Sequence, residues 1–192
     1  MPSLLTWFVE MSIWQKYSGP WDTAPSIRLW LTLVYPIKKL ILDLATRAAE
    51  NLSSYANVTV HAGDGAVFDP GECDAMLINA GMTHPIPLWL DHLRDRGRLV
   101  LPLTMAIGPM AGMGFMAKIV RERGGFSARI VTSVAIYSCK NARDPEREAS
   151  LKAVMTSGGL MKMRSVRRDA HEPTDTCVMH GGDVCLSSVE VG

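Results

Sequence analysis

The feature that most constrains the fold is an almost continuous apolar run, DAMLINA, at Asp74 to Ala80. A run of this length that is apolar on both faces is typical of a strand in a parallel sheet covered on both sides. A second such run, GRLVLPLT, lies at Gly97 to Thr104, and between the two the sequence predicts a short helix through Trp89, Leu90 and Leu93. This order predicts an α/β sandwich with a mainly parallel sheet, in which ligands bind beyond the carboxyl ends of the strands.

The flanking segments extend this pattern. Apolar residues at spacings of three and four predict a helix from Ile37 to about Ser54, and VTVHAG predicts a strand from Val58 to Gly63. Two further strands, Met113 to Glu122 and Phe126 to Cys139, are close enough in sequence to form an antiparallel hairpin at the sheet edge.

The C-terminal part shows weaker signals. Asp144 is placed to cap a helix that runs to about Thr156. Beyond Gly158 the sequence suggests only short strands, at Lys162 to Val166 and Thr176 to His180.

Composition narrows the partners and the compartment. A chain of 192 residues with 47% apolar content usually forms one domain, and 20 basic against 19 acidic residues create no strong net field. We therefore expect no nucleic acid and no membrane as partners. Four scattered cysteines predict reduced thiols in a cytoplasmic protein, and charged residues interrupt the apolar stretch from Leu4 to Trp30.

Several strings together resemble one enzyme family. LATRAAENL (Leu44 to Leu52), NVTVHAGDG (Asn57 to Gly65), DAMLINAGMTHPIPLWLDHL (Asp74 to Leu93) and GRLVLPLT resemble, in order and spacing, strings of the protein-L-isoaspartate O-methyltransferases. CKNARDP, RSVRRDAHEPTDTCVMHG and VCLS are similar to a C-terminal extension found in one bacterial branch of that family. The resemblance covers about residues 42–186.

The resemblance implies a Rossmann-like methyltransferase sandwich with an antiparallel edge hairpin. It also implies S-adenosyl-L-methionine as cofactor and an isoaspartyl-containing protein or peptide as substrate, methylated on a carboxylate for protein repair. Because a carboxylate is already ionised near neutral pH, this transfer requires no strong general base. The sequence accordingly identifies no catalytic residue.

The same resemblance implies which residues form the site. Asp64 and Gly65 would lie near the adenine, where a carboxylate can accept a hydrogen bond from the exocyclic amine. The stretch from Asn79 through Ala80 to Gly81 would lie near the methionine moiety of the cofactor. After it, Thr83 and His84 would contact the substrate. Asp64 could equally cap a turn, and a Gly- and Pro-containing turn can form without a ligand.

The beginning of the chain departs from the family pattern. No Gly-rich cofactor loop precedes Leu42, and Lys39 stands where the family has an acidic residue that binds ribose. After Thr104 the family's Gly-Gly-Asn-Gln-like string is replaced by Ala111 to Gly114. We therefore divide the chain into a divergent or mistranslated leader (1–41), a methyltransferase core remainder (42–157) and a C-terminal extension (158–192). The abrupt change favours a frame shift or a misassigned start.

Three alternatives stay open. The chain could methylate another acceptor, or it could be a non-catalytic fragment that binds a partner through an exposed sheet edge. Cys177, His180 and Cys185, with His171, are residue types that bind zinc, but their spacing is not one of the strong paired signatures. The sequence alone therefore favours reduced thiols and no metal.

Overall fold

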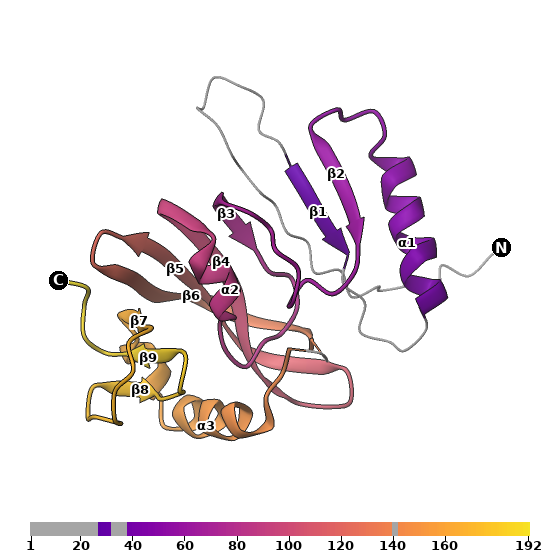
Figure 1. The fold of residues 1–192 in the computed structure, drawn as a ribbon. Helices are drawn as coiled ribbons and strands as arrows, with labels where there is room; N and C mark the ends of the chain where they lie inside the picture. Colours follow the sequence, from indigo (N-terminus) through magenta and orange to yellow (C-terminus); the bar gives the residue numbers. More distant parts are fainter. Residues whose placement is uncertain (1–26, 32–37, 140–141) are drawn as a thin grey trace.

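The computed structural model describes residues 27–31, 38–139 and 142–192 (Figure 1). Its strands form a two-stranded sheet, β1-β2, and a seven-stranded sheet in the order β3-β4-β5-β6-β7-β9-β8. The helices are few, so most of the core lies within and against the larger sheet.

The smaller sheet is parallel. Strand β1 (Ile27–Leu31) pairs with β2 (Val58–Ala62), and helix α1 (Lys38–Asn51) lies beside β2 (Figure 1). The predicted helix from Ile37 and the strand from Val58 are confirmed, whereas β1 was not predicted. The absence of a repeating pattern in the first forty residues left no signal for β1.

The larger sheet begins with the two apolar runs. Strand β3 (Cys73–Leu77) pairs in parallel with β4 (Leu93–Ala106), with Met76 opposite Leu99. Helix α2 (Pro87–Asp91) connects them and is shorter than predicted, because Leu93 already belongs to β4 and is buried in the core.

The predicted antiparallel hairpin is present, but its expected place at the sheet edge is wrong, because both of its strands have further neighbours and lie in the middle of the seven-stranded sheet. Strand β5 (Ala111–Glu122) pairs along its full length with β6 (Gly125–Tyr137). Gly125 at the turn has a φ of 150°, a conformation that glycine adopts without steric cost.

The expectation of a mainly parallel sheet requires correction. In the seven-stranded sheet only β3 and β4 run parallel, and the remaining neighbours are antiparallel. Short turns join β4 to β5 and β5 to β6, and such turns can connect only antiparallel strands. The apolar runs correctly predicted buried strands, since Leu99, Leu101 and Leu103 are fully buried, but burial does not encode strand direction.

The C-terminal segment extends the same sheet. Helix α3 (Pro145–Thr156) begins, as predicted, at Asp144, whose carboxylate accepts hydrogen bonds from the backbone N–H groups of Glu146 and Arg147. A short 3-10 helix η1 (Gly159–Lys162) follows.

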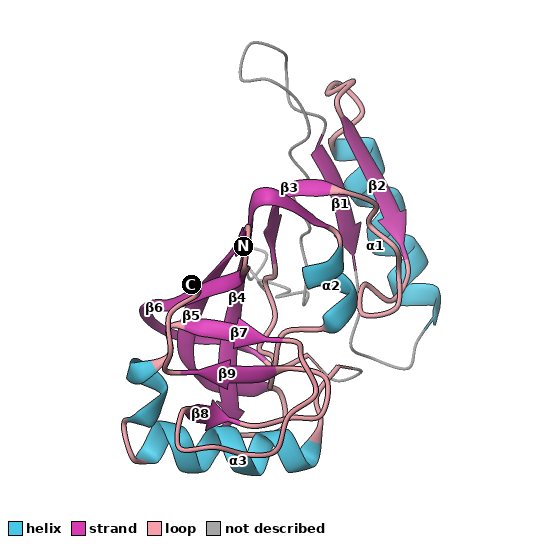
Figure 2. Cartoon of the chain, turned by 60° about the vertical axis from the view of Figure 1, so that its left-hand side comes forward, coloured by secondary structure: helices cyan, strands magenta, loops and turns pink. Residues whose placement is uncertain are grey.

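Three short strands complete the sheet. They are β7 (Ser165–Arg167), β8 (Cys177–Met179) and β9 (Cys185–Ser187). Figure 2 shows them beside β6, with α3 along the outer side of β8. The strand predicted at Thr176 to His180 corresponds to β8. Of the strand predicted at Lys162 to Val166 only the last two residues lie in β7, because Lys162 ends η1. Strand β9 was not predicted.

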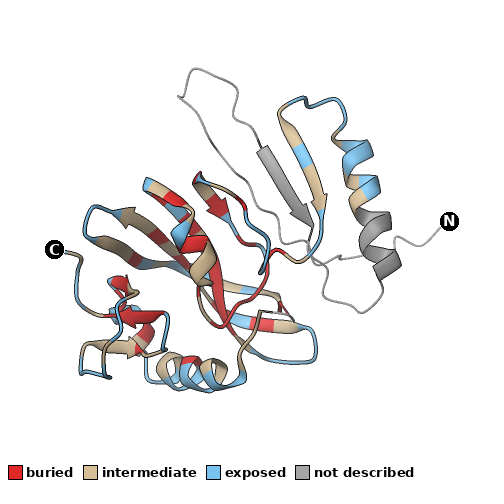
Figure 3. Cartoon of the chain, in the orientation of Figure 1, coloured by how far each residue is buried: buried red, intermediate tan, exposed pale blue. Residues whose placement is uncertain are grey.

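The buried residues lie mainly on β3, β4, β5, α2 and the C-terminal strands (Figure 3). Leu90, Leu99, Ile119 and Leu186 are fully buried and join the first part of the sheet to the last. No helix among the described residues is long and apolar enough to cross a membrane.

Candidate functional site

The acidic turn that was predicted to lie near the adenine contacts the helix that follows the second predicted cofactor segment. The acidic turn, Gly63 to Gly65, follows β2, and the loop from Ile78 to Ile86 follows β3. Trp89, in the helix after that loop, is buried, and its indole Nε1 donates a hydrogen bond of 3.1 Å to the carbonyl oxygen of Gly65. A direct contact therefore holds the acidic turn against the segment that follows β3.

Within the acidic turn, the side chain of Asp64 stabilises the backbone. Its Oδ1 accepts a hydrogen bond of 2.9 Å from the backbone N–H of Ala66, as in an Asx turn. A Cβ built on Gly63 would meet no atom within 4 Å, so the backbone beside Asp64 is open to close approach. The turn is thus preformed and exposed on the side of Gly63.

The three residues after β3 differ in their surroundings. Asn79 is exposed, whereas Ala80 and Gly81 are buried. The N–H of Gly81 donates to the carbonyl oxygen of Tyr137, and the carbonyl oxygen of Gly81 accepts from the N–H of Cys139. The polar groups of Asn79 can therefore face a ligand, while those of the Gly81 backbone are used within the fold.

The packing of Gly81 explains why a glycine stands there. A Cβ at this position would lie 2.3 Å from Oγ1 of the buried Thr104, which is closer than non-bonded atoms approach. A Cβ built on Gly112, on the neighbouring strand, would lie 2.6 Å from the same hydroxyl oxygen. Because Thr104 occupies the space beside residue 81, packing alone explains why this residue is a glycine. The predicted role of Gly81 in cofactor binding stays a prediction.

Thr83 is fully buried and contacts His84, not solvent. Its Oγ1 accepts a hydrogen bond of 3.2 Å from the N–H of Asp144 and lies 2.9 Å from Nδ1 of His84. The hydroxyl is best used if it accepts from Asp144 and donates to Nδ1. Thr83 therefore orients the imidazole of His84, and when its hydroxyl donates to Nδ1 the neutral ring carries its proton on Nε2.

The charges around His84 favour this neutral form. Burial, followed by the nearby guanidinium of Arg147, lowers the pKa of His84 from 6.5 to about 4, although Asp183 and Asp144 oppose the shift. A ring that is neutral at physiological pH can offer Nε2–H as an uncharged hydrogen-bond donor. The loop after β3 therefore carries an uncharged hydrogen-bond donor, the Nε2–H group of His84.

We expect nuclear magnetic resonance to find His84 neutral, with its proton on Nε2, at pH 7. Its titration should lie near pH 4, and Thr83→Val, which removes the hydroxyl without changing the shape, should abolish the tautomer preference. Because the folded state then binds fewer protons than the unfolded state, His84 should make the protein less stable as pH falls from about 6.5 to about 4. A protonated His84 at pH 6 would contradict this assignment.

Arg143, which the sequence analysis did not single out, forms a cluster of contacts with residues around the loop after β3. Arg143 is mostly buried, and its Nη2 lies 2.7 Å from Oε1 of Glu148 and donates at 2.8 Å to the carbonyl oxygen of Thr104. Its Nη1 donates to the carbonyl oxygen of Gly81 at 3.0 Å and to Thr104 Oγ1 at 3.1 Å. Arg143 therefore joins the ends of β3 and β4 to the start of α3. Nothing in the sequence pattern indicated which acceptors this arginine would reach.

The structure also brings together four residues that the sequence analysis left as thiols and ordinary histidines. The ligand atoms of His171, Cys177, His180 and Cys185 all lie within 4.8 Å of one another. The four cysteines of the chain are free, in keeping with the predicted absence of a disulfide framework.

Comparison with known proteins gives partial structural similarity only. No protein-family model matches the chain, and no curated protein matches it. Among solved structures, the chain is similar to a protein-L-isoaspartate O-methyltransferase, with a TM-score of 0.44 and 15% identity, over 69% of this chain and 38% of that chain. It is also similar to a putative protein-L-isoaspartate O-methyltransferase from Plasmodium falciparum in complex with S-adenosyl-L-homocysteine, with a TM-score of 0.40 and 18% identity, over 55% of this chain and 50% of that chain.

Proposed function

We propose that this chain is an S-adenosyl-L-methionine-dependent methyltransferase of the protein-L-isoaspartate type. One observation carries the proposal: the Trp89 to Gly65 hydrogen bond joins the acidic turn to the segment after β3. Gly65 belongs to the first predicted cofactor-binding string, and Trp89 belongs to the string from Asp74 to Leu93 that also contains the second, Asn79 to Gly81. The sequence strings from Leu44 to Thr104, in family order, support the same class.

The cofactor would be held mainly from one side. Asp64 and Gly65 would contact the adenine, and Asn79 would offer its exposed amide to the rest of the molecule. When bound, the cofactor supplies a methyl group on a positively charged sulfur. Gly81 and Ala80 would shape the floor of this region through packing rather than through polar contact.

The acceptor in this proposal is the carboxylate of an isoaspartyl residue in a protein or peptide. A carboxylate is ionised at neutral pH, so the site needs to orient it and not to deprotonate it. The Nε2–H of neutral His84 would donate a hydrogen bond to it, while buried Thr83 acts as a positioning residue. Since Thr83 is fully buried, we assign the direct substrate contact to His84 alone.

Calorimetric titration of the full chain with S-adenosyl-L-homocysteine tests the proposal. We expect saturable binding that Asp64→Ala weakens at least about tenfold, since a lost hydrogen bond to a charged group costs roughly 1.5 to 3 kcal/mol. Asp69→Ala is the matched control, because Asp69 makes the same kind of turn contact with Gly71 but lies outside the acidic turn. Asp69→Ala should leave affinity unchanged.

Absence of saturable binding by a folded sample would overturn the cofactor site. It would favour the second candidate, a non-catalytic domain, for which one observation speaks: within the described residues, β3 is one of the two edge strands of the larger sheet. Its outer edge could pair with a strand of another chain. A defined oligomer by light scattering, together with no cofactor binding, is the result expected for that candidate.

A further inference from the structure

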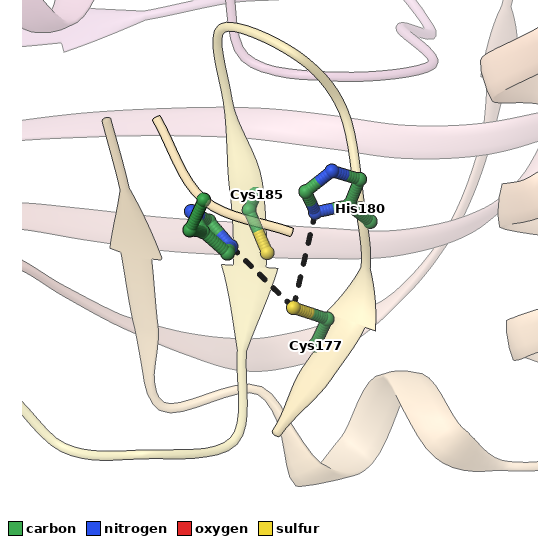
Figure 4. A group of neighbouring side chains, drawn as sticks. Cys177, His180 and Cys185 are labelled. Atoms are coloured by element: carbon green, nitrogen blue, oxygen red, sulfur yellow. Dashed lines mark hydrogen bonds between the residues drawn. The ribbon is translucent and has the colours of Figure 1, made fainter. Parts of the chain in front are cut away.

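The four clustered residues come from a short C-terminal stretch, and the strand pairing brings them together. His171 lies in the connection after β7, Cys177 begins β8, His180 follows β8, and Cys185 begins β9. Strands β8 and β9 are antiparallel neighbours with Cys177 opposite Ser187, and Cys185 lies two residues from Ser187 on the same face of β9, so the two cysteines are diagonal neighbours. Figure 4 shows Cys177, His180 and Cys185 turned toward a common point.

The distances are close to those of a tetrahedral coordination shell. Sγ of Cys177 lies 3.5 Å from Nε2 of His171 and 3.9 Å from Nδ1 of His180. Tetrahedral zinc with Zn–N bonds of about 2.0 to 2.1 Å and Zn–S bonds of about 2.3 Å separates its ligand atoms by roughly 3.3 to 3.8 Å. All four ligand atoms lie within 4.8 Å of one another, so shifts below about 1 Å would complete the shell.

The orientation of the histidine rings points to the same ligand. Nδ1 of His171 lies 2.8 Å from the carbonyl oxygen of Asp169, which leaves Nε2 facing the cluster. A metal-bound histidine usually donates its other ring N–H to a carbonyl or carboxylate in this way. The rings of His171 and His180 are in edge-to-face contact, with an angle of 83° between their planes.

We propose that His171, Cys177, His180 and Cys185 bind one zinc ion. Two thiolates and two imidazoles are ligands that zinc prefers, and four protein ligands leave no position for a substrate, which is the arrangement of a structural site. Strands β8 and β9 have only three residues each. A metal that joins both strands to the connection after β7 stabilises a hairpin too short to be stable by itself.

The zinc site also supports the surroundings of His84. Between His180 and Cys185 lies the turn that contains Asp183, whose carboxylate forms an ion pair with Arg147 of α3. Arg147 also faces Asp144, the residue whose N–H bonds to Thr83. Zinc would therefore fix the turn that positions Arg147. The site itself does not depend on the proposed methyltransferase function.

The test is metal analysis of the full chain, purified under reducing conditions without chelator. We expect about one zinc per chain by mass spectrometry. Cobalt added to the apo protein should give saturable ligand-field and thiolate charge-transfer absorption at one equivalent. Cys177→Ser and His180→Asn should each lower bound zinc at least fivefold, whereas Cys139→Ser, a cysteine outside the cluster, should retain it.

Two results would overturn the proposal. One is zinc below a tenth of an equivalent with no saturable cobalt spectrum in a wild-type sample that circular dichroism shows to be folded. The other is a disulfide between Cys177 and Cys185 in the wild-type protein, found by peptide mass mapping after purification without reductant. Because the cobalt titration uses the wild-type chain, a variant that fails to fold does not affect the conclusion.

Discussion

Replacing Arg143 with alanine is expected to lower the free energy of unfolding by about 3 kcal/mol, measured by urea denaturation. Breaking a buried ion pair typically costs about 3 to 5 kcal/mol, because the partner charge is left uncompensated. The lower end applies here, since the side chain of Arg143 is 10% exposed but that of Glu148 is 28% exposed. Arg143→Ala also removes donors from the carbonyl oxygen of Thr104 and from its hydroxyl.

A double-mutant cycle with Glu148→Ala separates the ion pair from the other contacts. If the pair carries much of the effect, the double variant should be more stable than the sum of the single losses predicts. Arg129→Ala, at an exposed position of β6, is the control and should change stability by less than about 0.5 kcal/mol. A loss below about 1 kcal/mol for Arg143→Ala would contradict this role.

The same pair predicts a pH dependence. Burial raises the pKa of Glu148, but the hydrogen bonds from Arg143 and from the N–H of Ala106 outweigh it and hold the pKa below its ordinary value. A carboxylate with a lowered pKa stabilises the fold above its ordinary pKa and loses that contribution as pH falls through the lowered value. The difference in stability between wild type and Arg143→Ala should therefore shrink in acid.

Replacing Gly81 with alanine is expected to cost about 1 to 3 kcal/mol in unfolding free energy, because the new methyl group would overlap the hydroxyl of Thr104. Thr104→Ala should partly restore stability, since it removes the hydroxyl oxygen that would stand 2.3 Å from the new methyl carbon. Urea denaturation of both single variants and the double variant measures this coupling. Gly108→Ala is the control, because a Cβ there meets nothing within 4 Å.

The outcome also bears on the predicted role of Gly81 in cofactor binding. If the glycine serves packing, Gly81→Ala destabilises the chain without ligand and Thr104→Ala compensates. An alanine variant with unchanged stability and weaker binding of S-adenosyl-L-homocysteine would instead support the cofactor role. The two interpretations therefore give opposite results in the same pair of measurements.

Local patterns in the sequence were sufficient for many elements. The apolar period after Ile37 predicted α1, and Asp144 as a cap predicted the start of α3. In both cases the information lies within one turn of helix or a few residues of strand. Strand β9 escaped prediction because its three residues carry no periodicity and form a strand only by pairing with β7 and β8.

The candidate site could be predicted only in part. The resemblance picked out Asp64 and the loop from Asn79 to His84, and the structure places the acidic turn against the segment that carries this loop. The resemblance could not show that Thr83 is buried and contacts His84. The environment of Thr83 depends on a hydrogen bond from Asp144, which is sixty-one residues away in the chain. Long-range hydrogen bonds of this kind leave no mark in local spacing.

The sequence by itself determined which segments are buried and where most helices and strands begin, because periodicity and capping act over a few residues. Only the tertiary structure decided the direction of the strands, the contacts of Arg143 and the gathering of His171, Cys177, His180 and Cys185. These features arise when the chain folds back on itself and brings separate strands and loops into contact. Strand pairing sets which side chains meet, and the spacing of those residues along the chain does not encode it.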